Sequence, residues 1–222
     1  MKKAYDQVVQ ALPESRSAQA LLGQQMQAYS WYEETGGHAP DYPDLIAALS
    51  LQVSDDLCVM ESSGEQRLIA ASVCSPSYWK KKKKIGLSLS DIHRPVTSLQ
   101  QKIGSQIQRF IAQAPLMTPF ERSNWFVHGN RQRMHLAPEG NITGSPEQWF
   151  LRSERETLCR FHNDYLLFTI NVRFAPLRDI VHYPAALEDL TDSLSRFDAD
   201  EIDYFGGDTK YQRLGEYLAG LR

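Results

Sequence analysis

The chain has 222 residues, of which 42% are hydrophobic and 23% charged, as in a globular protein with a sizeable core. Its formal net charge of −3 argues against a general nucleic-acid binder, because such proteins need a basic surface. No apolar run approaches the roughly 18 residues of a membrane span, and the polar N-terminal residues do not resemble a signal peptide. We therefore expect a cytoplasmic protein that binds neither membrane nor nucleic acid.

The first 44 residues predict a helical extension. Apolar side chains recur at helical spacing between residues 18 and 29, and the glycine- and proline-containing stretch 36–40 breaks that helix. Two apolar segments, 57–61 and 68–74, then predict a β-hairpin.

Five consecutive lysines at 80–84 follow this hairpin. A run of like charges usually forms a solvated face, and a docking patch for an acidic flavodoxin or ferredoxin is the alternative. Ser90 or Asp91 is expected to cap a short turn, and Pro95 restricts the backbone after His93. A lone histidine is more often structural than functional, but this position also suits a haem ligand, which must present one nitrogen in a fixed direction.

The remaining pattern predicts helices at both sides of a β region. In chain order, we expect a helix at 96–114, a strand at 124–128, a long hairpin of strands 149–161 and 165–174, and helices at 185–197 and 211–221. On the first helix, one apolar face holds Leu99, Ile103, Ile107, Phe110 and Ile111.

This order of elements predicts an α+β fold, with a PAS-like antiparallel sheet, helices on one face and flanking N- and C-terminal helices. We expect a helical extension at 1–44, a PAS-like domain at 45–183 and C-terminal helices at 184–222 that pack on the same domain.

Histidines and cysteines are the candidate metal ligands. No two of the six histidines have HxH or HxxxH spacing, and there is no CxxC pair, so the local sequence does not predict a zinc site. Cys58, Cys74 and Cys159 lie in apolar, strand-like runs and are predicted to be buried free thiols. Motifs of nucleotide-binding domains and α/β hydrolases do not occur.

The strand at 149–161 carries a dense charged cluster, namely Arg152, Glu154, Arg155, Glu156 and Arg160. On a solvated face such charges pair across strands without further function. Alternatively, one set of alternating side chains faces a cofactor pocket, where arginines hold carboxylates and a glutamate binds an amine. The residues alone leave both interpretations open.

Four stretches carry a family resemblance. Trp79, Lys84-Ile85-Gly86, Leu89 and Ile92-His93-Arg94-Pro95-Val96 are similar to the pattern PxxW…KxGxxLxxIHxPVP, and Arg122-Ser123-Asn124-Trp125 is similar to RxNW. Residues 151–160, LRSERETLCR, resemble LRxERQTLxR, and Phe168-Thr169-Ile170 with Pro176-Leu177 resemble FTIRTYxxPL. In this order they resemble the haem-dependent oxidative N-demethylase alpha-subunit family, from about Leu45 to Leu221.

The resemblance implies a PAS-like domain that holds haem b, with a histidine as the protein ligand to iron. It further implies a monooxygenase that oxidises a small amine or amino-acid-like substrate with dioxygen, by oxidative N-demethylation or N-hydroxylation. Electrons would come from a separate flavin or iron–sulfur reductase. His93 is the one histidine at a motif position, and is therefore the predicted iron ligand.

The same motifs suggest further site residues. Cofactor binding is predicted for Arg152, Arg155, Arg160 and Trp125, and a catalytic or substrate-binding role for Glu154, Glu156, Asn171 and Arg173. Thr97 replaces a family proline, and Asn171 replaces an arginine beside the additional carboxylate of Glu156, which changes the charge that the pocket accepts. A non-enzymatic PAS-like sensor of haem or a small ligand, and a haem-free interaction module, are the alternatives.

Overall fold

The computed structural model describes residues 53–78, 84–93, 104–137, 139 and 142–221, together with Ile46 and Ser50. The predicted extension at 1–44, the lysines at 80–83 and the first part of the helix predicted at 96–114 lie outside the described residues.

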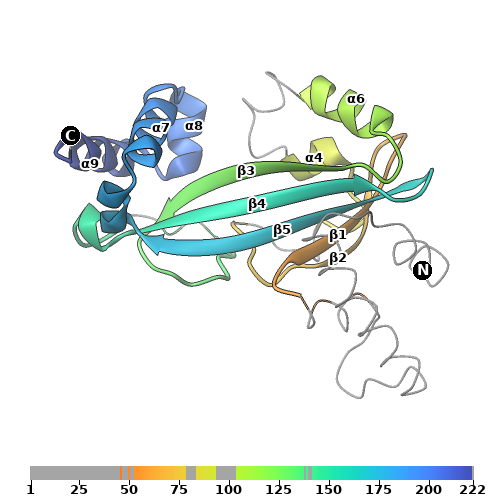
Figure 1. The fold of residues 1–222 in the computed structure, drawn as a ribbon, viewed down its shortest axis with the longest axis horizontal. Helices are drawn as coiled ribbons and strands as arrows, with labels where there is room; N and C mark the ends of the chain where they lie inside the picture. The colour runs from red at the N-terminus through yellow and green to blue at the C-terminus, as the bar shows by residue number, and fades with distance from the viewer. Residues whose placement is uncertain are drawn as a thin grey trace, which may run out of the picture.

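Five antiparallel strands form one sheet within the described chain (Figure 1). They are β1 (Asp56–Glu61), β2 (Leu68–Ser72), β3 (Pro119–His128), β4 (Phe150–Arg160) and β5 (Tyr165–Pro176), in the spatial order β2-β1-β5-β4-β3. Both predicted hairpins, β1–β2 and β4–β5, are present. The predicted α+β class with an antiparallel sheet is thus confirmed.

Short helices accompany the sheet. The helices α4 (Leu89–His93) and α6 (Ser105–Gln113) lie on one side of it, and α7 (Pro184–Ser195), α8 (Ala199–Phe205) and α9 (Asp208–Ala219) gather at one end (Figure 1). Two 3₁₀ helices, η3 (Pro146–Gln148) and η4 (Leu177–His182), flank the β4–β5 hairpin. No helix of the described segments is long and apolar enough to cross a membrane.

Alternation along the strands gives the sheet two faces. We call the side that packs against α4 and α6 the helix-covered face. There Leu89, Ile92, Ile107 and Ile111 meet strand residues that include Leu166 and Phe168. Successive side chains of a strand point to opposite sides, so the even-numbered residues of β3, β4 and β5 share this face. Their odd-numbered neighbours form the opposite face, where Leu57, Val59 and Leu167 pack with Ile46.

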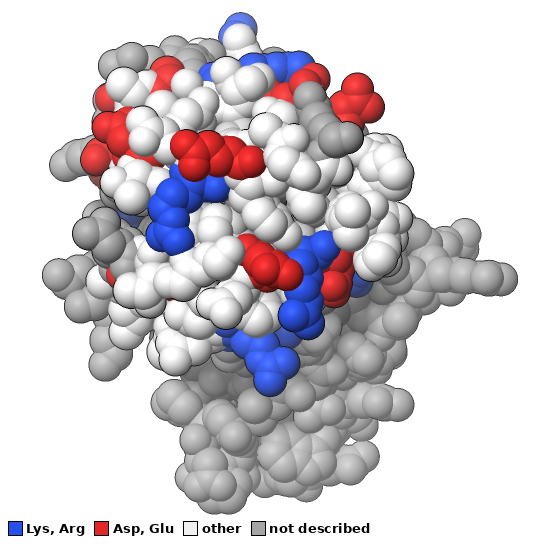
Figure 2. All heavy atoms as spheres, turned by 90° about the vertical axis from the view of Figure 1, so that its left-hand side faces the viewer, with Lys and Arg blue, Asp and Glu red and all other residues white. Residues whose placement is uncertain are grey.

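The C-terminal helices share a core with the end of β3. Leu187, Leu190 and Leu194 of α7 pack with Leu214 and Leu218 of α9 around buried residues of the sheet end. The sequence prediction omits α8, which is short and begins with a capping box in which Asp198 and Glu201 exchange hydrogen bonds. At this end of the molecule, acidic and basic side chains are interspersed among uncharged ones (Figure 2).

Two packing predictions are wrong in detail. Phe110 is 45% exposed, because α6 turns Ile107 and Ile111 toward the sheet and leaves Phe110 to pack edge-on against Phe120. Cys58 and Cys159 are buried as predicted, but Cys74 is exposed because it lies past the end of β2.

Candidate functional site

The predicted ligand His93 lies at the end of α4, which a tight turn attaches to β2. Gly86 has a φ of +83°, which favours glycine, and its N–H donates to the Leu68 carbonyl at 2.7 Å. Ser88 caps α4, because the backbone N–H of Asp91 donates to Ser88 Oγ at 3.1 Å. The prediction that Ser90 or Asp91 is the cap is therefore wrong by two or three residues.

Lys84 secures the other end of this helix. Its Nζ donates to the backbone carbonyl of Ile92 at 2.9 Å, and burial lowers its pKa. A cation on a C-terminal carbonyl is a favourable helix end. The last lysine of the run thus has a contact beside His93.

The imidazole of His93 has a defined orientation. The ring is half-buried and its Nδ1 lies 2.9 Å from the carbonyl oxygen of Leu89. A carbonyl oxygen only accepts, so Nδ1 carries the proton and the neutral ring keeps its lone pair on Nε2. Burial lowers the pKa of His93, and the charges of Arg122 and Lys84 lower it further, while the bond to Leu89 opposes them. The ring is therefore held in the neutral form that binds metals.

Strand register brings two of the sequence motifs side by side. Arg122 pairs with Glu156, and Asn124 with Glu154, across β3 and β4. Arg122 Nε donates to Glu156 Oε2, and Asn124 Nδ2 lies 3.4 Å from Glu154 Oε2. All four are even-numbered and share the helix-covered face with α4. Arg122, which the sequence analysis did not select, is therefore a further candidate.

The two carboxylates differ in their surroundings. The side chain of Glu156 is 6% exposed, and burial raises its pKa against the opposing charge of Arg122. Glu154 accepts from Arg152 Nε at 2.7 Å. Burial raises the pKa of Tyr204, and the charge of Glu154 raises it further, which places this α8 phenol near the same row of charges.

Arg152 is almost fully enclosed by protein. It is 1% exposed, and its guanidinium donates to the carbonyl oxygen of Ser75 at 2.6 Å, to Glu154 and, at 3.4 Å, to the Arg133 carbonyl. All three nitrogens have protein partners. This arrangement positions Glu154.

Three other predicted residues lie on the opposite face. Register pairs Arg155 with Asn171, and Arg173 lies two residues farther along β5. Asn171 Nδ2 donates to Ser54 Oγ at 3.0 Å and to Asp55, while Arg173 Nε donates to Asn171 Oδ1 at 2.9 Å. The structure therefore does not bring these side chains together with Glu154 and Glu156.

The last two predicted residues have structural contacts. Arg160 donates to the carbonyls of Ala112 and Ala114 at 3.1 and 3.4 Å, which ties the C-terminal end of α6 to β4. Trp125 stacks on Phe197, with ring centroids 5.8 Å apart.

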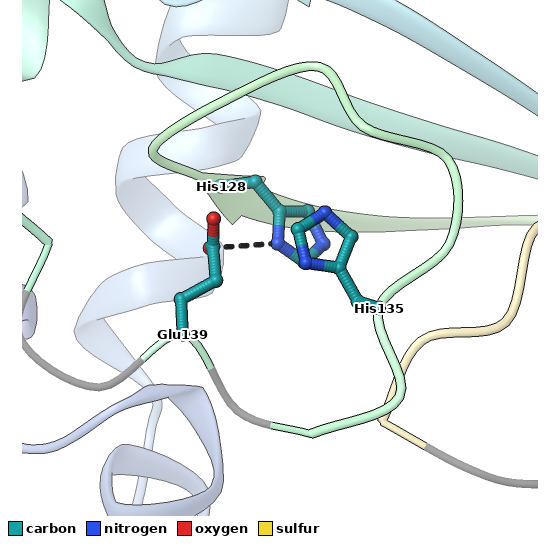
Figure 3. A group of neighbouring side chains, drawn as sticks. All are labelled: His128, His135 and Glu139. Atoms are coloured by element: carbon teal, nitrogen blue, oxygen red, sulfur yellow. Dashed lines mark hydrogen bonds and ion pairs between the residues drawn. The ribbon is translucent and has the colours of Figure 1, made fainter.

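A second cluster, which the sequence analysis missed, lies where β3 ends (Figure 3). His128 Nδ1 and Glu139 Oε2 are 2.8 Å apart, and the ring of His135 stacks on that of His128 at 4.1 Å. The histidines are seven residues apart and lack the HxH or HxxxH spacing of a local metal motif, so the sequence does not signal the cluster. It forms because the loop after β3 returns to the strand end.

A family model described as "Haem-dependent oxidative N-demethylase, alpha subunit-like" matches residues 2–214. This is the family that the four motifs predict. A search of curated proteins finds no match.

Proposed function

We propose that this chain, which belongs to the haem-dependent oxidative N-demethylase, alpha subunit-like family, binds haem b through His93 and oxidises an amine or amino-acid-like substrate. When bound, the haem supplies the dioxygen chemistry that removes an N-methyl group or hydroxylates the nitrogen. The observation that carries the proposal is the orientation of His93, whose Nδ1 is committed to the Leu89 carbonyl.

The surroundings of His93 support a ligand role. A histidine that binds a metal usually donates its other N–H to a carbonyl or carboxylate, which fixes the ring and makes the ligating nitrogen more basic. The Ser88 cap and the bond from Lys84 to Ile92 hold the short helix that presents the ring. Lys84 and His93 belong to the same family motif. The bond from Lys84 to the helix that carries His93 gives a physical reason why the motif contains both residues.

Glu154 and Glu156 are proposed to bind the substrate amine. They lie on the helix-covered face, as α4 does, and a carboxylate there attracts an ammonium group. Arg122 is 59% exposed, so it can turn to a substrate carboxylate while Glu156 takes the amine. Asn171, Arg173 and Arg155 remain predictions, and from the opposite face they would act by positioning the strands.

We also propose a domain arrangement and an electron-donor partner for this chain. The strand order β2-β1-β5-β4-β3, with α4 and α6 between β2 and β3, supports a PAS-like domain. We propose that it spans 45–183, between an extension at 1–44 and C-terminal helices at 184–222. A separate flavin or iron–sulfur reductase would supply electrons, with the lysine run 80–84 as its docking patch. Replacing the lysines at 80–83 with glutamine, while Lys84 keeps its bond to the Ile92 carbonyl, should then weaken the salt dependence of reduction.

Haem titration of the purified chain tests the ligand. The wild type should give a Soret band with one haem per chain and a ferrous–CO spectrum, and His93→Ala should lose or shift both. His182→Ala is the matched control, because His182 is exposed and lies outside the motifs. A His93→Ala spectrum identical to that of the wild type would refute the assignment.

Activity requires a second experiment. Candidate amines should shift the spin state of the haem, and Glu154→Gln and Glu156→Gln should weaken this response. Amine-dependent oxygen consumption with a chemical reductant would support the proposed monooxygenase. Haem binding without such consumption would favour the PAS-like sensor.

A further inference from the structure

The cluster of His128, His135 and Glu139 has no role in the proposed oxidation. Arg122 is the candidate-site residue whose charge acts on His93. His128 lies six residues farther along β3, a distance of roughly 20 Å in an extended strand. The three side chains come from the end of the strand and from the following loop (Figure 3). The cluster is therefore separate from the candidate haem ligand.

Both histidines carry a buried nitrogen without a partner in the described structure. His128 is 0% and His135 6% exposed, and neither Nε2 makes a hydrogen bond. An unsatisfied buried polar atom costs about 1–3 kcal/mol, so a pair of them needs an explanation. One cation that accepts electron pairs from this group would remove the cost.

We propose that His128, His135 and Glu139 form a binding site for a divalent transition-metal ion of the Zn²⁺ class. Two imidazoles and one carboxylate are a ligand set that suits zinc, and one candidate atom from each residue lies within 4.8 Å of the others. Ligand atoms around a tetrahedral zinc are roughly 3.4 Å apart, from metal–ligand bonds of about 2.1 Å. To bind zinc, the candidate ligand atoms therefore need to approach one another by about 1.4 Å at most.

Metal binding requires two local changes. The two rings are only 17° from parallel, so their in-plane lone pairs run side by side rather than converge. The His135 ring must turn, and the hydrogen bond between His128 and Glu139 must give way to coordination. The backbone of His135 stays anchored, because its N–H donates to the Pro76 carbonyl at 3.0 Å and its carbonyl accepts from the Tyr78 N–H at 2.7 Å.

The surroundings leave room and tolerate the charge. A depression of about 570 Å³ is lined by His135, Glu139 and neighbours such as Met134, though not by His128, so water or a small ligand can approach the cluster from the side of His135 and Glu139. The nearby cation is Lys210, and burial lowers its pKa to about 7, so it repels a metal little above neutral pH. Glu139 contributes the opposite charge.

Direct metal binding tests the site. The full-length chain is stripped with a chelator, then titrated with Zn²⁺ against a chromogenic chelator, and with Co²⁺ while visible absorption is recorded. We expect one ion per chain and the intense visible bands of a four-coordinate Co²⁺ site. His135→Ala and Glu139→Gln should each weaken Zn²⁺ binding by at least about tenfold, since loss of an outer-sphere partner alone costs about 10–100-fold.

His182→Ala is again the control and should bind as the wild type does. Glu139→Gln keeps the shape of the side chain and an acceptor for His128, so it separates loss of coordination from loss of fold, which circular dichroism checks. Absence of stoichiometric binding would overturn the proposal, as would equal affinity of the wild type, His135→Ala and Glu139→Gln. Loss of binding in His182→Ala would point to a different site and also overturn it.

Discussion

Arg152→Met is expected to destabilise the haem-free protein strongly. Arg152 is 1% exposed, and its loss leaves the Ser75 carbonyl without its 2.6 Å donor and the Glu154 carboxylate without its ion-pair partner. Removing one member of a buried charged pair costs about 3–5 kcal/mol. For a chain of this length that corresponds to a fall in Tm of roughly 10 °C. Methionine keeps the aliphatic part of the side chain but removes the guanidinium carbon, which lies 5.7 Å from the centre of the Phe174 ring, so the loss comes from the polar contacts and from this cation–π contact.

Urea unfolding of the haem-free chain, followed by circular dichroism, measures this effect. Arg196→Met is the control, because Arg196 is 78% exposed in an i,i+4 pair with Asp192, a type worth about 0.3–0.5 kcal/mol. The double variant with Glu154→Gln should lose less than the sum of the single losses. If Arg152→Met costs below about 1 kcal/mol without haem but weakens haem binding, Arg152 is a cofactor ligand, as the sequence predicts, and our structural reasoning is wrong.

Three further substitutions test charged side chains, two at the candidate haem site and one, Lys210, beside the second cluster. Burial raises the pKa of Glu156, so the folded chain keeps a proton that the unfolded chain releases, and stability falls as pH rises through that range. Glu156→Gln should therefore gain stability relative to the wild type from acid to neutral pH in urea unfolding, and a constant difference would contradict this. Burial lowers the pKa of Lys210 from 10.5 to about 7, so only the unfolded chain stays protonated above pH 7 and wild-type stability rises with pH. With chelator present, the free energy of unfolding of the wild type should rise relative to that of Lys210→Met by up to about 3 kcal/mol between pH 7 and 9, at 1.36 kcal/mol per pH unit. A difference between the two proteins that does not change with pH would refute this prediction. Lys84→Met, which removes the bond to the Ile92 carbonyl, should weaken haem binding roughly fivefold, or about 1 kcal/mol, in spectral titration, and unchanged affinity would exclude a positioning role.

Periodicity predicted the long hairpin well because β4 and β5 are central strands. Arg152, Glu154, Glu156 and Arg160 alternate along the sequence, which puts them on one face of a strand, and the register agrees. Prediction failed at the edge of the sheet. β3 begins at Pro119, five residues before the predicted start. The prediction missed these residues because the first half of the strand is exposed and has no apolar alternation. Without that half, the pairing of Arg122 with Glu156 could not be seen from the sequence.

Side-chain direction also limited the prediction of the site. The motif comparison led us to expect that the side chains of Asn171 and Glu156 share one pocket. The strand register instead pairs Ile170 with Glu156, so the side chain of Asn171 points to the opposite face of the sheet. A one-residue difference in pairing changes the face of every side chain on a strand. The cluster of His128 and His135 had no local signal either, because it depends on the path of a loop.

The same residues that define the candidate site also fix the register of its strands. On the helix-covered face, Arg122 meets Glu156, and on the opposite face Val127 pairs with Leu151 in the apolar core. A slip of one residue would set Arg122 beside Arg155 or Thr157 and turn Val127 away from the core. The charged pair is therefore favoured by folding, even though its buried carboxylate is costly. This explains how RSNW and ERET can be separated by about 30 residues and still lie side by side: the pairing that selects the sheet register also places the carboxylates on the face that α4 covers.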